Sequence, residues 1–158
     1  MNVLFVCYGN ICRSPMAEGI AGAMFMGDDF LHVESAGLHA VPDNAPSENA
    51  VTVCLKHGID IRRHRARAVT PILLSRIDLV FCMERYQCLD VLANAPHLLP
   101  VRLIGEDVPG IPDEIPDPYG HGLPTYERTF QSLTRAIAFH LGHLRERREY
   151  DRKAKTSG

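Results

Sequence analysis

The sequence predicts an α/β protein in which helices cover both faces of a parallel sheet. Four short apolar segments typical of buried strands follow one another along the chain, at residues 2–6, 31–35, 79–83 and 101–104. Helical patterns with one apolar face alternate with them, and strands that alternate with helices favour a parallel sheet. At 158 residues the chain is long enough for one domain with a substantial core.

The first strand leads directly into a tight loop and a helix. Residues 3–6 form an unbroken apolar run, as a buried parallel strand requires. Gly9 and Asn10 follow, and these residue types most readily take a positive φ. Ser14 and Pro15 are typical of a helix start, with a capping hydroxyl and then a proline whose fixed φ suits the first turn.

The other helices follow from apolar positions that recur every three or four residues. The first stripe consists of Ala17, Ile20, Ala21 and Met24, and the second of Ala50, Val51, Cys54 and Leu55. A long amphipathic helix near the C-terminus is predicted from Phe130, Leu133, Ile137, Leu141 and Leu144.

The domain is expected to span residues 1–146. Residues 147–158 carry mixed charges and lack an apolar stripe, so we expect a charged, disordered and solvated tail. A basic docking tail is the alternative interpretation of this segment.

Composition and charge exclude several classes of protein. The chain has 17 basic and 19 acidic side chains, so nothing indicates a nucleic-acid partner. The N-terminus lacks a basic region, and its apolar run is too short for a signal peptide or a membrane span, so we expect a cytoplasmic protein. Five cysteines without paired C-x-x-C spacing favour neither a disulfide framework nor a zinc site, and we expect no metal or cofactor.

The segment between Cys7 and Arg13 indicates the chemistry. The strand, the loop and the helix N-terminus direct backbone N–H groups and the positive end of a helix at one point, which favours a bound dianion. The same field stabilises a thiolate on Cys7 and makes it a nucleophile, while Arg13 offers a planar fork to two phosphoryl oxygens. Alone, C-x5-R is a weak signal, because Cys7 could be a buried cysteine at a strand end. The flanking features favour a phosphate-binding loop made of Tyr8, Gly9, Asn10, Ile11, Cys12, Arg13 and Ser14.

These residues resemble the low-molecular-weight protein tyrosine phosphatase family. The family pattern V-C-x-G-N-x-C-R-S-P stands here at residues 6–15, and its second signature, Asp-Pro-Tyr, at residues 117–119. Further landmarks occur in the usual order at residues 35–37, 58–60, 64–67 and 82–84, so that the resemblance covers about residues 2–145. The Ile-Pro-Asp-Pro-Tyr form and the segment at residues 94–96 are more similar to the bacterial branch than to the animal one.

The resemblance implies a four-stranded sheet of order 2-1-3-4, in the phosphatase I or flavodoxin-like fold. It also implies hydrolysis of phosphotyrosine and other aryl phosphate monoesters through a phosphocysteine on Cys7. Loop N–H groups and Arg13 would hold the equatorial oxygens, and Asp117 would protonate the leaving oxygen and later act as a base on water. A turn-forming role is the alternative for Asp117, and Asp113 and Glu114 are expected to be loop charges.

Several further residues match supporting positions of the family. Ser14 is expected to donate its hydroxyl to the sulfur of Cys7. Asn10 matches the left-handed residue of the loop, which Ser35 and His64 would hold in place. A general base is the alternative role for His64, but four nearby arginines favour a structural or surface role.

Three residues are expected to shape the substrate pocket. Tyr119 would stack on a flat aromatic substrate, and Tyr8 would add aromatic surface. Family members that act on phosphoarginine tend to carry threonine where this chain has Ile11, so isoleucine favours phosphotyrosine. The implied partner is a phosphotyrosine protein, with a bacterial tyrosine autokinase as one example, and we expect a monomer or a weak dimer.

The remaining cysteines leave alternatives open. Cys12 would form a disulfide with Cys7 on oxidation, or it is a small residue that packs the loop. A thiol-dependent arsenate reductase is the competing enzyme, for which Cys82 and Cys88 are the available redox pair. The other alternative is a non-catalytic module that binds phosphoproteins, which would have no need of an acid at residue 117.

Overall fold

The computed structural model describes residues 1–156 as nine elements of secondary structure. They are, in chain order, β1 (Asn2–Cys7), α1 (Arg13–Met24), β2 (His32–Gly37), α2 (Glu48–Lys56), α3 (Pro71–Leu74), β3 (Leu79–Cys82), α4 (Arg85–Asn94), β4 (Val101–Leu103) and α5 (Leu123–Thr156). Among these residues no helix is both long enough and apolar enough to cross a membrane.

The sheet has four parallel strands in the order β2-β1-β3-β4. This confirms the predicted fold class and strand order, and each predicted strand lies within two residues of the observed one. In the register, Val3 of β1 lies between Val33 of β2 and Leu79 of β3. The central strand β1 therefore delivers its last residue, Cys7, to the carboxyl edge of the sheet, where ligands bind in such folds.

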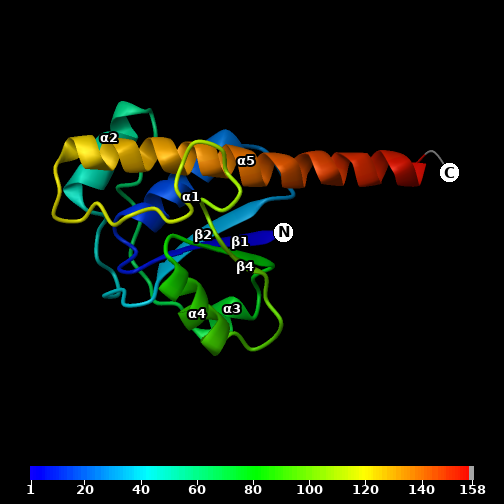
Figure 1. The fold of residues 1–158 in the computed structure, drawn as a ribbon, viewed down its shortest axis with the longest axis horizontal. Coiled ribbons are helices and arrows are strands. Elements are labelled where there is room, and N and C mark those ends of the chain that lie inside the picture. The colour runs from blue at the N-terminus through cyan, green and yellow to red at the C-terminus, as the bar shows by residue number, and fades with distance from the viewer. Residues whose placement is uncertain (157–158) are drawn as a thin grey trace.

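Helices cover the sheet on two sides (Figure 1). Val3 and Phe5 of β1 belong to the larger core cluster, under α1 and α5, whereas Leu4 and Val6 belong to the cluster under α3 and α4. All four side chains are fully buried. Burial on both faces explains why the sequence of β1 is continuously apolar rather than alternating.

Helix α1 begins two residues earlier than expected. Arg13 is its first residue and Cys12 occupies the N-cap position, so the prediction that Ser14 caps the helix is wrong. Ser14 lies inside the first turn, where its hydroxyl faces Cys7 instead of the helix backbone. Pro15 is tolerated there because the N–H groups of a first turn have no intrahelical partner.

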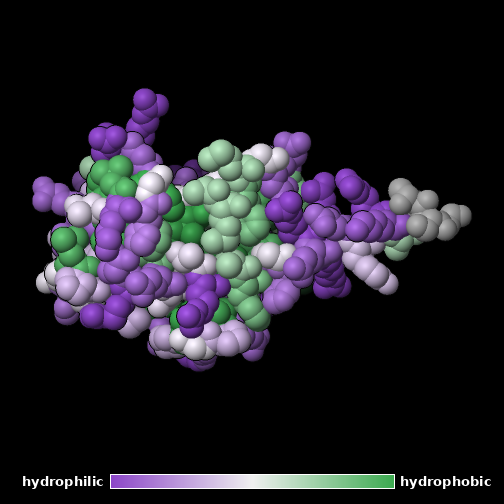
Figure 2. Space-filling view, turned by 90° about the horizontal axis from the view of Figure 1, so that it is seen from above, coloured by the Kyte–Doolittle hydropathy of each residue, from purple (hydrophilic) through white to green (hydrophobic). Residues whose placement is uncertain are grey.

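Helix α5 continues beyond the core and differs from the expected disordered tail. Leu141 is its last fully buried residue, yet the helix runs on to Thr156, projects from the body (Figure 1) and carries hydrophilic side chains (Figure 2). Extension of an existing helix needs no new nucleation, and Arg, Glu and Lys are good helix formers. Arg145 and Arg148 also approach Asp28, and Arg148 lies 4.2 Å from the centroid of the Phe30 ring. Residues 157–158 of the predicted tail lie outside the described residues.

Candidate active site

Cys7 lies at the end of β1 with its sulfur surrounded by donors. Its side chain is buried, the Sγ atom lies 3.0 Å from Ser14 Oγ, and the backbone N–H of Asn10 donates to it at 3.3 Å. Helix α1 starts at Arg13, so the unpaired N–H groups and the positive end of the helix also face this loop. These N–H groups and the helix terminus favour an anion at this point of the loop.

Arg13 is the most constrained cation of the site. Its guanidinium is 1% exposed, and Nη1 donates to Glu84 Oε2 at 2.7 Å and to the carbonyl of Ile115 at 2.8 Å. Nη2 lies 3.2 Å from Asp117 Oδ2. Nε is buried and has no hydrogen-bond partner within residues 1–156. Because an unpaired buried donor is costly, this N–H group is suited to an anionic ligand.

Asn10 determines the curvature of the loop. Its φ is 56°, in the left-handed region, and its side chain donates to Ser14 Oγ and Ser35 Oγ at 2.8 and 2.9 Å. The Oδ1 atom accepts the backbone N–H of Arg67, and the carbonyl of Asn10 lies 2.9 Å from His64 Nε2. The structure therefore brings Ser35 and His64 to the loop residue with which the family resemblance associated them, and it adds Arg67.

Gly37 allows the end of β2 to pack directly against the loop. A Cβ atom on Gly37 would lie 2.8 Å from the backbone nitrogen of Asn10 and 2.8 Å from the carbonyl oxygen of Tyr8. The following residues continue the contact, since the N–H groups of Leu38 and His39 donate to the carbonyls of Cys7 and Tyr8. Only glycine leaves room for this approach of two backbones.

Asp117 lies on the loop between β4 and α5, above Arg13. Its side chain is 42% exposed, and its Oδ1 atom accepts the backbone N–H of Tyr119 at 3.1 Å. The loop is anchored by a hydrogen bond from the N–H of Ile115 to the carbonyl of Met83. The turn-forming and catalytic interpretations of Asp117 are therefore compatible, because one carboxylate oxygen holds the turn and the other faces Arg13.

The two other acidic residues of this loop have different partners. Asp113 pairs with the guanidinium of Arg85 at 3.0 Å, and Glu114 accepts the backbone N–H of Arg85 at 2.7 Å. Both contacts attach the loop to the start of α4, in agreement with their expected role as loop charges.

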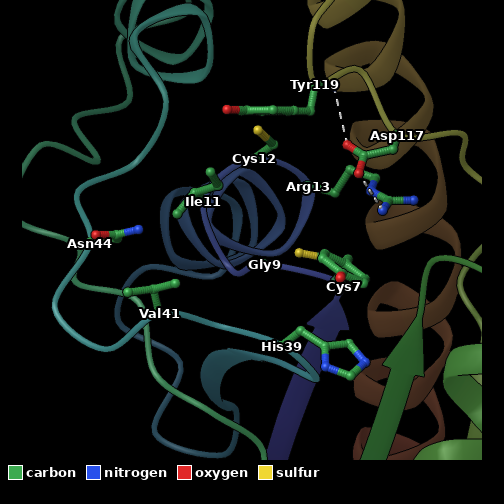
Figure 3. Close-up of a pocket in the computed structure, with 11 residues that line it drawn as sticks. Cys7, Gly9, Ile11, Cys12, Arg13, His39, Val41, Asn44, Asp117 and Tyr119 are labelled. Carbon is green, nitrogen blue, oxygen red and sulfur yellow. Dashed lines mark hydrogen bonds and ion pairs between the residues drawn. The ribbon is translucent and has the colours of Figure 1, made fainter.

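A cavity of about 220 Å³ opens above Cys7 (Figure 3). The predicted pocket residues Tyr8, Ile11 and Tyr119 line it together with Arg13 and Asp117. The sequence did not single out three further lining residues, all on the loop after β2, which are His39, Val41 and Asn44. Their position in the sequence could have indicated them, because they follow the carboxyl end of β2, a strand adjacent to β1, and ligands bind at the carboxyl ends of parallel strands.

Glu84 is a second residue that the sequence left without a role. It precedes α4, bonds Arg13, and accepts a hydrogen bond from Gln87 Nε2 at 3.1 Å. The signal was a carboxylate two residues after the buried strand β3, because the carboxyl ends of β1 and β3 lie side by side.

The other cysteines differ in their surroundings. Cys12 is buried beside the hydroxyls of Ser47 and Tyr126, and burial raises the pKa of its thiol. Cys82 is fully buried at the end of β3, where contact with the Cys88 thiol and burial raise its pKa, while the same contact lowers the pKa of the half-buried Cys88. All five cysteines are free thiols. Residues 1–156 contain no cluster of three or more side chains that would ligate a metal.

Comparisons with known proteins agree with this geometry. The family model of low molecular weight phosphotyrosine protein phosphatases matches residues 2–150. The probable low molecular weight protein-tyrosine-phosphatase EpsP of Ralstonia nicotianae is 35% identical over 136 residues, which are 85% of this chain and 90% of that protein.

Solved structures resemble the fold over most of its length. The low molecular weight protein tyrosine phosphatase from T. tengcongensis superposes with a TM-score of 0.80 at 39% identity, covering 87% of this chain and 95% of that one. The tyrosine phosphatase Wzb from Escherichia coli K30, solved in complex with sulphate, gives a TM-score of 0.80 at 29% identity, covering 90% and 97%. With its Cys7-to-Arg13 loop and a family match over nearly its whole length, the chain belongs to the low molecular weight protein-tyrosine-phosphatases.

Proposed function

We propose that this protein hydrolyses phosphotyrosine in protein substrates through a phosphocysteine on Cys7. The convergence of Cys7, Arg13 and Asp117 on one cavity carries this proposal. The cavity supplies the three groups that hydrolysis of a phosphate monoester requires, namely a nucleophile, a cation for the phosphoryl oxygens and a carboxyl group near the leaving oxygen.

In the first step, the phosphate binds against the loop N–H groups and the free Nε of Arg13. The thiolate of Cys7 attacks phosphorus in line, the bond to the phenolic oxygen breaks, and protonated Asp117 gives its proton to that oxygen. Glu84 and the carbonyl of Ile115 keep Nη1 of Arg13 occupied, so the remaining edge of the guanidinium is directed at the phosphate.

In the second step, water attacks the phosphocysteine and Asp117 accepts a proton from it. The bond between phosphorus and sulfur breaks, and Cys7 leaves as a thiolate. Ser14 Oγ and the N–H of Asn10 lie within hydrogen-bonding reach of that sulfur and stabilise its charge. Inorganic phosphate is released and the enzyme returns to its first state.

The mouth of the cavity favours an aromatic substrate. The side chain of Tyr8 is 49% exposed and that of Tyr119 is 65% exposed, and both line the cavity together with Ile11. A phenyl ring fits between these surfaces, whereas the flexible, cationic chain of phosphoarginine would gain less from them. Bacterial relatives are named protein-tyrosine-phosphatases, so the expected substrate is a tyrosine-phosphorylated protein, such as a bacterial tyrosine autokinase. A reactive thiol needs reducing surroundings, which supports action in the cytoplasm.

The Cys7→Ser variant tests this proposal. A serine hydroxyl stays protonated at neutral pH, so turnover of p-nitrophenyl phosphate and of a phosphotyrosine peptide should fall by at least about a thousandfold. Vanadate should still bind, because the loop and Arg13 remain. Cys88→Ser is the matched control and should retain activity, since Cys88 lies outside the cavity. Residual turnover of Cys7→Ser within about tenfold of wild type would contradict the assignment.

A further inference from the structure

Cys12 of the phosphate loop forms a ring of hydrogen bonds with Ser47 and Tyr126. Cys12 Sγ donates to Ser47 Oγ at 3.2 Å, and Ser47 Oγ donates to the hydroxyl of Tyr126 at 3.3 Å. The Tyr126 hydroxyl and Cys12 Sγ are 3.3 Å apart, and either atom can be the donor. When the Tyr126 hydroxyl donates to Cys12 Sγ, each of the three groups donates one hydrogen bond within the ring and accepts one. The S–H group and both O–H groups then all have an acceptor.

The ring joins three helices at their first turns. Cys12 is the N-cap of α1, Ser47 is the N-cap of α2, and Tyr126 lies in the first turn of α5. Cys12 is 4% exposed and Tyr126 is 2% exposed, which protects these bonds from competition with water. The backbone N–H of Ser47 also donates to the carbonyl of Ile11 at 2.8 Å, so the same residue holds the adjacent loop peptide.

Burial keeps Cys12 as a neutral thiol, although its hydrogen bonds with Ser47 and Tyr126 act to lower its pKa. Burial raises the pKa of Cys12, and burial also raises the pKa of Tyr126 to about 12. All three members are therefore uncharged at neutral pH, so that in the proposed function Cys7 is the one thiol of the loop that reacts as a thiolate. A second thiolate here would repel the phosphate dianion.

Cys12 lines the same cavity as Cys7 but lies on another side of it. Figure 3 shows Cys12 beside Tyr119, whereas Cys7 lies at the end of β1, across the loop. A sulfur atom of Cys12 that bonds to Cys7 must leave both of its hydroxyl partners, because a disulfide requires the two sulfurs to approach to about 2.05 Å.

We propose that Ser47 and Tyr126 are positioning residues that restrain the Cys12 sulfur and thereby set how fast Cys12 resolves an oxidised Cys7. The inference rests on the proposed function, in which Cys7 is the reactive thiolate. A hydroperoxide oxidises that thiolate to a sulfenic acid and is itself reduced to water or an alcohol. The Cys12 sulfur then attacks the Cys7 sulfur, the S–O bond breaks, and the hydroxyl leaves with the Cys12 proton as water.

A second oxidation competes with this resolution. Another hydroperoxide molecule converts the sulfenic acid on Cys7 to a sulfinic acid, which thiols do not reverse. The ring decides between the two products, because it determines how often the Cys12 sulfur is free to turn towards Cys7. Loss of the Tyr126 hydroxyl should speed resolution about fivefold, which corresponds to the loss of one net hydrogen bond.

The test compares oxidation products in wild type, Tyr126→Phe and Tyr150→Phe. Each protein is treated with hydrogen peroxide at neutral pH, quenched with an alkylating reagent and analysed by mass spectrometry for the Cys7–Cys12 disulfide and for Cys7 sulfinic acid. Tyr126→Phe should raise the ratio of disulfide to sulfinic acid about fivefold. Tyr150→Phe is the matched control, because Tyr150 is exposed on the projecting end of α5, and it should give the wild-type ratio.

Two variants of Ser47 give an independent result if Tyr126→Phe fails to fold. Ser47→Gly removes the hydroxyl but retains good N-capping ability, and should raise the ratio of disulfide to sulfinic acid. Ser47→Thr retains a hydroxyl and should give the wild-type ratio. An unchanged or lower ratio in the hydroxyl-deleted proteins would overturn the proposal, and so would the absence of the disulfide from all of them. Mass spectrometry detects the disulfide and the sulfinic acid without any measurement of phosphatase activity. If the wild-type protein formed these oxidation products but did not hydrolyse p-nitrophenyl phosphate, only the proposed function would be overturned.

Discussion

Asp117 shows how one side chain can serve a turn and a reaction. Its Oδ1 atom is held by the N–H of Tyr119, which leaves Oδ2 directed at Arg13 and the cavity. We expect Asp117→Asn to keep this turn, because an amide oxygen accepts the same hydrogen bond, while the proton donor is lost. The kcat for phosphotyrosine should fall about 100-fold or more, and the loss should be smaller for aryl phosphates whose phenols are more acidic.

The measurement is kcat for a series of aryl phosphates in wild type and Asp117→Asn. The alkaline limb of the pH–rate profile should also flatten in the variant, because the group that must stay protonated is gone. If kcat depended on the pKa of the leaving phenol as weakly in the variant as in wild type, the proton would come from another donor. Asp113 and Glu114 would then be tested next, although their contacts with Arg85 direct them away from that role.

Asn10 gives a second prediction at this scale. Asn10→Ala removes three side-chain hydrogen bonds, leaves the partly buried N–H of Arg67 without its acceptor, and places alanine at a φ of 56°. The free energy of unfolding should fall by about 3 kcal/mol, and vanadate binding should weaken with it. Urea denaturation and vanadate inhibition measure the two effects.

Asp43→Ala is the control for Asn10→Ala. Asp43 also has a positive φ, 67°, but it is exposed and lies outside the Cys7 loop. Its replacement should cost only the backbone strain, about 1 kcal/mol, and leave vanadate binding unchanged. Equal losses of stability in the two variants would mean that the hydrogen bonds of Asn10 contribute nothing beyond its conformation.

Residues of the site were predictable where a local pattern carried their chemistry. Cys7 and Arg13 could be identified because the apolar strand, the Gly-Asn pair and the helix start surround them within one short segment. Glu84 offered only its place after a buried strand and Tyr126 offered no local signal, because they reach the loop through the fold, from 71 and 114 residues along the chain. Their contacts depend on strand order and helix placement, which a local pattern does not determine.

At the scale of elements, the strands were easier to predict than the helix ends. Burial on both faces makes a strand such as β1 continuously apolar, whereas the start of α1 depends on how the loop closes. Ser14 has the composition of an N-cap, but its hydroxyl is used by Cys7 and Asn10, so the helix begins at Arg13. Competition between a local capping bond and a tertiary one therefore explains the wrong boundary.

Helix α5 gives a prediction at this scale, because its two halves differ in burial. The side chains of residues 150–155 on the projecting end are exposed, so removal of residues 150–158 should change the free energy of unfolding by less than about 0.5 kcal/mol. The helical signal in circular dichroism should decrease, and kcat/KM should stay within about twofold of wild type.

A longer truncation is the control for this prediction. Removal of residues 140–158 deletes Leu141, which is fully buried in the larger core cluster, and should destabilise the protein by about 3 kcal/mol or more. A large loss of stability on removing only residues 150–158 would show that the projecting end packs on the body of the protein. Chemical denaturation of both truncated chains separates these outcomes.

At the scale of the whole molecule, the site depends on elements from the entire chain. The loop after β1 is contacted by Gly37 at the end of β2, by Glu84 after β3 and by Ile115 on the segment after β4. The parallel arrangement makes this possible, since all four strands end at the same edge of the sheet. Stability of the sheet and of the helices above it therefore maintains the geometry of the site.

His140 lies where α5 packs on the sheet and gives a prediction about the stability of the whole molecule. It is 6% exposed, its ring lies 4.9 Å from that of Phe81, and its Nε2 atom contacts the carbonyl of Ile104 at 3.0 Å. Burial lowers the pKa of His140 below its ordinary value of about 6.5. The unfolded chain therefore binds a proton more readily than the native protein does, and the stability that neutral His140 provides is lost as pH falls below about 6.5.

We therefore expect the free energy of unfolding to decrease between about pH 7.5 and about pH 5.5 in wild type. Carboxylates with a lowered pKa, such as Glu34 and Asp60, add their own losses only at lower pH, where carboxyl groups titrate. His140→Gln keeps a donor for the carbonyl of Ile104 but does not titrate, so its decrease over this range should be shallower. His143→Gln is the control, because His143 is exposed on the same helix and should give the wild-type slope. Urea denaturation across the pH range measures the three slopes, and parallel curves for wild type and His140→Gln would show that His140 does not carry this pH dependence.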